Sequence, residues 1–186
     1  MSPPDARSGT ALGSGATAAT VLNPYSDNVV FVDTEFSGLE FYLGELISIG
    51  LVKLSGEELY LELDYSGPVN EFVQREVLPK LQGPKVPVSE AVARIKEFVG
   101  DGKPYMVSEG GHYDVLYVYK LFGIAEQPFN WVPLELTSML FSHGIRPRLD
   151  EFAASLGINR SRFRNDHALD DARFLRELYL RAVTDR

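Results

Sequence analysis

The stretch VVFVDTEF, residues 29–36, joins a short run of apolar, mostly β-branched residues to two acids. Four consecutive apolar residues of this kind are typical of a strand that is buried on both faces. Asp33 and Glu35 stand at its end, and residues i and i+2 of an extended chain point to the same face. Their carboxylates repel each other there, so a divalent cation is their natural partner. Taken alone, the acid pair still favours a plainer interpretation, a solvated strand end that begins a turn.

Two more strands are expected directly after this one. LISIGLVKL (residues 46–54) is a second apolar run, and EELYLELD (residues 57–64) alternates polar and apolar residues as a half-buried strand does. The Ser55-Gly56 pair between them is a turn signal. Three strands joined by short connections predict an antiparallel start to the sheet.

Beyond residue 64 the sequence changes to helical patterns. Ser89 is expected to be an N-cap, and Gly123 and Gly157 are expected to end helices, while Pro79 should stop the first of them. Tyr105-Met106-Val107 predicts a brief buried strand. The predicted helices cover residues 70–78, 90–99, 114–122, 133–143, 149–156 and 168–183. The expected fold class is therefore α/β, with a mixed sheet flanked by helices.

Composition limits the kind of protein this is. The 186 residues suit one domain; we expect a disordered tail over residues 1–27 and a single folded domain over 28–186. The chain has no cysteine, which excludes disulfides and thiolate metal sites, and its net charge of −8 disfavours non-specific coating of nucleic acid. It has neither a membrane-spanning apolar run nor the pattern of a secretory signal. We expect a cytoplasmic protein that does not bind membranes.

Two later segments carry the remaining candidate residues. Asp114 begins the predicted middle helix, where an aspartate can simply favour the helix dipole. His167 and Asp171 open the last helix and, four residues apart, lie on one helical face. That spacing suits a base beside a metal ligand, but an acidic first turn favoured by the dipole accounts for it too. Neither segment decides the function alone.

Together, these motifs resemble those of the DEDD superfamily of 3′→5′ exonucleases, in its histidine-containing DEDDh branch. The chain shows the same order: a buried strand ending in Asp-x-Glu, an aspartate at the start of a middle helix, and a His–Asp pair opening the last helix. Three blocks further resemble the actinobacterial RNase AS exoribonucleases, namely FVDTEF (31–36), ELISIG (45–50) and VLPKL (77–81). The resemblance extends over most of the expected folded domain.

The resemblance implies a ribonuclease-H-like fold and two Mg²⁺ ions, for which Mn²⁺ can substitute. It implies four metal ligands, with Asp33 bridging both ions and Glu35, Asp114 and Asp171 completing the site. It also implies His167 as general base, a role that the near-neutral pKa of imidazole suits. The implied partner is single-stranded nucleic acid, RNA above all, and homodimer formation is left open.

The third motif departs from the family in one respect. His167 stands one residue closer to Asp171 than the family's histidine does, and an alignment on the ALDDA segment that begins at Ala168 puts Asp166 in the histidine's place. Helical phase favours Asp171 over Asp170 as the ligand, because Asp170 is turned toward a more polar arc. Imidazole is better matched to proton transfer at neutral pH than an ordinary carboxylate, so His167 is the predicted base.

Contacts to the substrate are expected from two groups of residues. Arg160, Arg162 and Arg164 precede the third motif, and arginine forks suit phosphate oxygens; a solvated loop that balances local acids is the competing interpretation. Thr34 and Phe36 flank the acidic pair, and Phe36 could stack on a terminal base or belong to the core.

The predicted function is a two-metal-ion 3′→5′ exoribonuclease that removes nucleoside monophosphates from single-stranded RNA, with adenylate-rich tails as one substrate. Two alternatives remain open. One is a phosphodiesterase that acts on dinucleotides or short oligonucleotides, and the other is a catalytically impaired relative that only binds nucleic acid.

Overall fold

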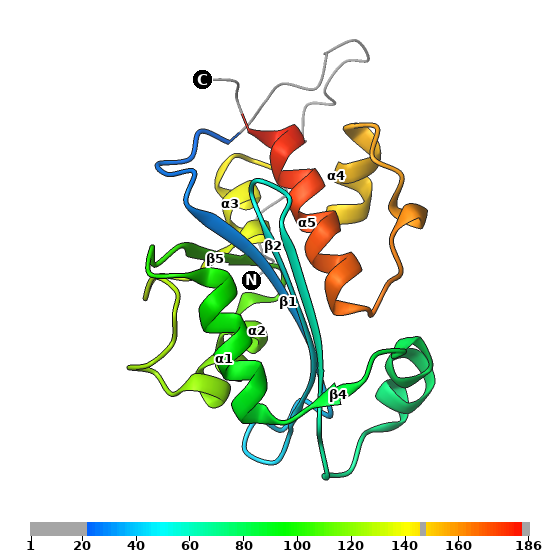
Figure 1. The fold of residues 1–186 in the computed structure, drawn as a ribbon. Helices are drawn as coiled ribbons and strands as arrows, with labels where there is room; N and C mark the ends of the chain where they lie inside the picture. The colour runs from blue at the N-terminus through cyan, green and yellow to red at the C-terminus, as the bar shows by residue number, and fades with distance from the viewer. Residues whose placement is uncertain (1–21, 146–147, 184–186) are drawn as a thin grey trace, which may run out of the picture.

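A computed structural model describes residues 22–145 and 148–183 of the chain (Figure 1). The predicted tail at residues 1–27 falls mostly outside these ranges. Its described end is ordered, because Leu22 is buried in the core and its N–H donates to the carbonyl oxygen of Ala182 at 2.7 Å. The folded chain therefore starts before the predicted boundary at Asn28. No helix among the described residues is long and apolar enough to cross a membrane.

The sheet has six strands in the order β4-β3-β2-β1-β5-β6. Strand β1 lies inside it and pairs antiparallel with β2 and parallel with β5, while β2 and β3 form the expected antiparallel pair. The mixed sheet with an antiparallel three-strand start is confirmed. The strands are β1 (Val29–Phe36), β2 (Leu46–Lys53), β3 (Glu58–Leu63), β4 (Lys85–Val86), β5 (Tyr105–Ser108) and β6 (Leu134–Glu135).

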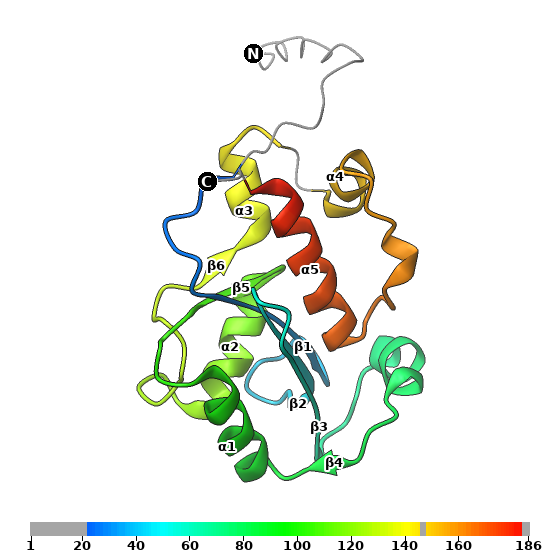
Figure 2. The same ribbon diagram turned by 45° about the horizontal axis from the view of Figure 1, so that its top comes forward.

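Helices cover both faces of the sheet (Figures 1 and 2). Phe31 packs into the cluster formed with α3, α4 and α5, whereas Val30 and Val32 pack into the cluster formed with α1 and α2. This explains why the start of β1 is apolar at every position. The helices are α1 (Val88–Val99), α2 (Gly111–Phe122), α3 (Leu136–Ser142), α4 (Leu149–Ser155) and α5 (Ala168–Ala182).

The alternation of side chains along β1 determines the face of the sheet on which Asp33 and Glu35 lie. Phe31 faces α5, with its ring 5.2 Å from that of Tyr179. Asp33 and Glu35, two and four residues later, share that face. Strand β1 is parallel to β5, so Asp33 and Glu35 leave the sheet at the edge where β5 also ends. The first turn of α5 is packed over that edge (Figure 2).

The structure corrects three local predictions. Helix α1 begins at Val88 after Pro87, and Ser89 is not its N-cap. The predicted helix at 70–78 is irregular: it contains a π-helical turn η1 (Val73–Val77) and continues through Pro79 as the 3₁₀ turn η2 (Leu78–Lys80). The predicted helix at 133–143 begins only at Leu136, because the two residues before it pair with β5 as strand β6. In each case a tertiary contact or a local turn overrides helix propensity.

Gly50 allows α5 to approach the sheet. It pairs with Asp33 across β1 and β2, and a Cβ atom added to it would lie 2.5 Å from the Cα of Leu169 and closer still to the Ala168 carbonyl. These are backbone atoms, which cannot turn aside as a flexible side chain can. Any side chain at this position would push the first turn of α5 away from the acids of β1.

We therefore expect Gly50→Ala to lower the free energy of unfolding by about 1–3 kcal/mol, the usual cost of overpacking. Gly102→Ala is the matched control, because a Cβ there would meet only the Asn28 side chain, at an ordinary 3.7 Å. Urea denaturation of both variants measures the difference. Equal stability of the two would contradict the close packing of α5 on Gly50.

Candidate metal centre

Three carboxylates converge at the acidic end of β1. Asp33 and Glu35 come from β1 and Asp171 from the first turn of α5, and one oxygen of each lies within 4.8 Å of the others. All three side chains are half-buried. The helical-phase argument for Asp171 is consistent with this placement. Hard oxygen ligands at this spacing fit a divalent cation such as Mg²⁺ or Mn²⁺.

Asp114 reaches the same place from α2 but is held differently. Its side chain is only 4% exposed, and its Oδ1 accepts hydrogen bonds from the backbone N–H of Thr34 at 3.0 Å and from the Thr34 hydroxyl at 2.6 Å. Thr34 thus holds Asp114 and also lines a cavity beside the carboxylates, and its contact with substrate stays a prediction. Asp114 lies beside Asp33, outside the cluster of three.

These acids line a cavity of about 450 Å³. Glu109 also lines it, a residue that the sequence analysis did not select. The signal was present, because Glu109 directly follows Ser108, the last residue of β5, and parallel strands end at the same edge of a sheet. The other lining residues are Thr34, Phe36, Gly110, Tyr113, Asp150, Arg160, Asn165, Asp166 and Phe174.

Burial and mutual repulsion disfavour the charged form of these carboxylates. Burial, followed by the charge of Asp171, raises the pKa of Glu35 to about 8. Burial raises the pKa of Asp114 to about 7 against the hydrogen bonds from Thr34. Burial and the charges of Asp114 and Asp171 also raise the pKa of Asp33 well above its usual value. A bound cation would remove this conflict, so the electrostatics of the site match its ligand chemistry.

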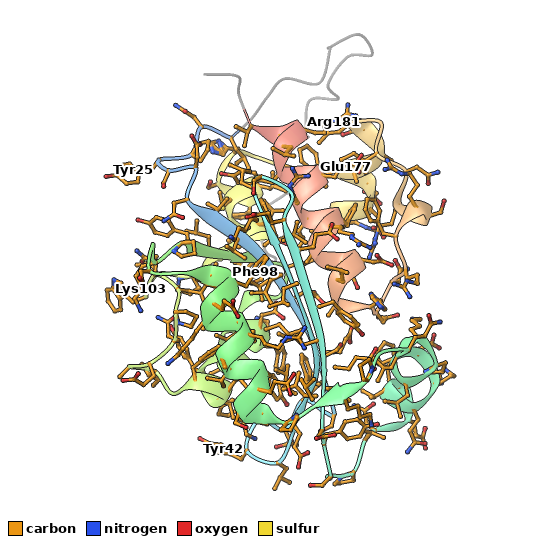
Figure 3. All side chains as sticks on the ribbon, in the orientation of Figure 1. Tyr25, Tyr42, Phe98, Lys103, Glu177 and Arg181 are labelled. Carbon is orange, nitrogen blue, oxygen red and sulfur yellow. The ribbon has the colours of Figure 1, made fainter. Side chains whose placement is uncertain are left out.

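Of the three predicted arginines, only Arg160 lines the cavity. Its Nη2 donates to Asp171 Oδ1, its guanidinium carbon lies 4.2 Å from the centre of the Phe174 ring, and its Nη1 is buried without a partner. Arg162 instead pairs at 3.2 Å with Glu177, which lies toward the C-terminal end of α5 (Figure 3). Arg164 pairs at 2.5 Å with Asp170.

The predicted base His167 does not line the cavity. Its side chain is 4% exposed and stacks on Tyr60 with 4.8 Å between ring centroids. As the N-cap of α5, it accepts a hydrogen bond at Nδ1 from the Asp170 N–H at 3.4 Å. Burial and the nearby Arg164 lower its pKa, which keeps the ring neutral. In this arrangement His167 acts on the helix rather than on a substrate.

Asp170 lies toward Arg173, as its helical phase predicts, but its side chain is buried. It is buried at 7% exposure and accepts hydrogen bonds from Arg164 and, at 2.7 Å, from Arg173. Burial alone would raise the pKa of Asp170, but these hydrogen bonds hold it below its usual value. Helical phase placed Asp170 toward Arg173, but it could not show that Arg164, which precedes the helix, also pairs with this carboxylate and that the side chain is buried.

Phe36 packs against the core and also faces the cavity, while its stacking on a terminal base stays a prediction. Its ring stacks on Tyr117 at 4.4 Å and on Tyr113 at 5.4 Å, so it is packed against α2. It also lines the cavity together with Tyr113. The two rings form an aromatic wall beside the carboxylates.

Because Glu35 and Asp114 carry raised pKa values in the folded state, the folded protein binds more protons than the unfolded chain between about pH 4 and pH 8. The metal-free protein should therefore melt at a lower temperature as pH rises through this window. Mg²⁺ should raise the melting temperature more at pH 8 than at pH 5, since it binds ionised carboxylates. Thermal denaturation in chelator and in Mg²⁺ measures both effects. A melting temperature that rises from pH 5 to pH 8 in chelator would be the contrary result.

No family model and no curated protein matches the sequence. Solved structures match its fold. Exonuclease I superposes with a TM-score of 0.63 at 15% identity, over 81% of this chain and 39% of its own. E. coli exonuclease I in complex with a dT13 oligonucleotide gives 0.62 at 14% identity over the same shares. S. pombe Pop2p, in its Mg²⁺- and Mn²⁺-bound form, gives 0.64 at 14% identity, over 85% of this chain and 86% of its own.

The chain thus spans well under half of exonuclease I but most of Pop2p. At these identities the likeness concerns the fold. The α/β fold, with its mixed six-stranded sheet and flanking helices, is the ribonuclease H-like fold that exonuclease I and Pop2p share.

Proposed function

We propose that the protein is a metal-dependent 3′→5′ exonuclease that removes nucleoside monophosphates from single-stranded RNA. The observation that carries the proposal is the convergence of Asp33, Glu35 and Asp171 within 4.8 Å, in a cavity at the sheet edge of an exonuclease fold. Two divalent cations held about 3.5–4 Å apart at such a site would activate a water and stabilise the leaving 3′ oxygen. Asp33, Glu35 and Asp171 would hold them, with Asp114 beside Asp33.

The remaining residues that line the cavity are suited to binding the end of a single nucleic-acid strand. Arg160 presents a buried guanidinium nitrogen without a partner, and a phosphate oxygen is the acceptor that a guanidinium fits best. Phe36 and Tyr113 offer ring faces beside the carboxylates, on which a terminal base can stack. An acidic protein can bind one strand end in this way, because the positive charge is needed only locally.

A single-stranded substrate is supported by the dT13 oligonucleotide bound to E. coli exonuclease I. The choice of RNA rests on the resemblance of residues 31–36, 45–50 and 77–81 to the RNase AS enzymes, which also suggests adenylate-rich tails. The position of His167 outside the cavity gives weight to the alternative of a catalytically impaired nucleic-acid binder. Activity measurements separate these functions.

With end-labelled single strands, we expect Mg²⁺- or Mn²⁺-dependent release of mononucleotides from the 3′ end, faster from RNA than from matched DNA. Excess chelator should abolish the activity.

Asp33→Asn should also remove nearly all of the exonuclease activity while raising the melting temperature of the metal-free protein, because the substitution relieves repulsion among carboxylates. Undiminished turnover in chelator would refute the metal site. Equal rates on RNA and DNA would refute only the ribonuclease assignment, and cleavage of dinucleotides alone would indicate the phosphodiesterase.

Arg160 and Arg162 provide a matched pair for the phosphate contact. Arg160→Met at saturating metal should raise KM by roughly 10- to 100-fold, the worth of one charge-assisted hydrogen bond, and should flatten the salt dependence. Arg162→Met should change KM less than about twofold, because Arg162 is largely exposed, pairs with Glu177 and does not line the cavity. Equal effects of both substitutions would assign the arginines to general electrostatics rather than to the cavity.

A further inference from the structure

The turn before α5 places a further carboxylate, that of Asp166, in the cavity. Asn165 and Asp166 both line it, whereas the next residue, His167, does not. Asp166 has a backbone φ of 51°, in the left-handed region that aspartate tolerates better than most residues. A backbone held in an uncommon conformation beside a functional site indicates that the surrounding structure determines it.

Lys80 fixes this turn from another part of the chain. Its Nζ donates to the Asn165 carbonyl at 2.7 Å and to Asp166 Oδ2 at 3.1 Å. Lys80 belongs to the turn η2, which both ribbon views show beside the start of α5 (Figures 1 and 2). It thereby holds both the backbone and the side chain of the turn in place.

Asp166 also lies within electrostatic reach of the metal ligands. Its charge contributes, after burial and other groups, to the raised pKa of Glu35 and to that of Asp171. The charge of Lys80 acts on Glu35 in the opposite direction. Asp166 therefore faces Glu35 from β1, Asp171 from α5 and Lys80 from η2, while its side chain remains 35% exposed.

We propose that Asp166, rather than His167, accepts the proton of the attacking water, and that Lys80 is its positioning residue. This inference rests on the proposed exonuclease function. The water oxygen forms a new bond to phosphorus as the bond between phosphorus and the 3′ oxygen breaks. The water proton passes to the Asp166 carboxylate, and the leaving 3′ oxygen takes a proton from solvent. The products are a nucleoside 5′-monophosphate and a strand shortened by one nucleotide.

A carboxylate can fill this role because carboxylates are among the side chains that act as general bases. A water held at a divalent cation is more acidic than bulk water, so a strong base is not needed. His167 is already used as the N-cap of α5 and is stacked on Tyr60. Moving it into the cavity would cost the helix its cap and uncover a buried ring.

Asp166→Asn is the decisive variant. Asparagine tolerates the left-handed conformation, and its amide oxygen can still accept from Lys80, so folding and Mn²⁺ binding should be unchanged. We expect kcat to fall by roughly 10²–10⁴ with little change in KM, the usual worth of a general base. Asp150→Asn, which removes another cavity carboxylate, should lower kcat only a few-fold. Asp166→Gly relieves the backbone constraint and serves as a second variant if Asp166→Asn folds poorly.

Two measurements distinguish chemistry from structure. Asp166→His should recover part of the activity lost in Asp166→Asn, with an acid limb near pH ~6.5 that belongs to imidazole. Lys80→Met should lower kcat by a larger factor in the wild-type background than in Asp166→Asn, because its contact with the Asp166 carboxylate is lost only in the former. An equal factor in both backgrounds would assign the effect of Lys80 to its contact with the Asn165 carbonyl or to its charge near Glu35.

The inference is overturned if Asp166→Asn keeps near-full kcat, or if His167→Asn loses as much kcat as Asp166→Asn while both still bind Mn²⁺. Its failure can be told apart from failure of the proposed function. A wild-type protein that releases no mononucleotide refutes the exonuclease itself, whereas an active wild type with an equally active Asp166→Asn refutes only the role of Asp166.

Discussion

Helix α5 reaches the acidic end of β1 because Gly50 leaves no side chain between them. The added Cβ would meet the backbone of Ala168 and Leu169, so the first turn of the helix rests directly on the sheet. Asp171 follows within that turn and meets Asp33 and Glu35 within 4.8 Å. The close approach also places the turn at residues 165–166 along the cavity wall. Both the metal ligands and the proposed proton acceptor depend on this one packing contact.

The cost of this arrangement is electrostatic. Several carboxylates share a partly buried cavity, and burial and repulsion raise the pKa of Glu35 to about 8 and of Asp114 to about 7. Two positively charged side chains reduce the repulsion among these carboxylates. Arg160 pairs with Asp171, and Lys80 pairs with Asp166. Such a site would stabilise a bound divalent cation at the expense of the metal-free fold, the usual trade between stability and function. The metal affinity that we propose and the loss of stability that we expect with rising pH would therefore have the same electrostatic origin.

Asp166 and His167, two adjacent residues at the start of α5, have different roles. His167 caps the helix and stacks on Tyr60, while Asp166 lines the cavity and is held by Lys80. The left-handed backbone at Asp166 lets the chain turn from the cavity wall into the helix. Of these two neighbouring positions, residue 166 lines the cavity and residue 167 caps the helix. The order of Asp166 and His167 therefore determines which of the two side chains is available at the site.

The periodicity of apolar residues in the sequence determined the first strands of the sheet and the placement of the acidic residues at their end. The apolar run of β1, the alternation in β3 and the spacing of Asp33 and Glu35 depend on local geometry, so the three-stranded start and the shared face of the two acids were predictable. Helical phase likewise selected Asp171 over Asp170. Only the tertiary structure decided the rest. Arg164 and Arg173 bury Asp170, Glu58 shares Arg173, and Tyr60 covers His167. The contacts of Arg173 with Glu58 and of His167 with Tyr60 join segments far apart in the chain, and local residue patterns do not encode the distance between such segments.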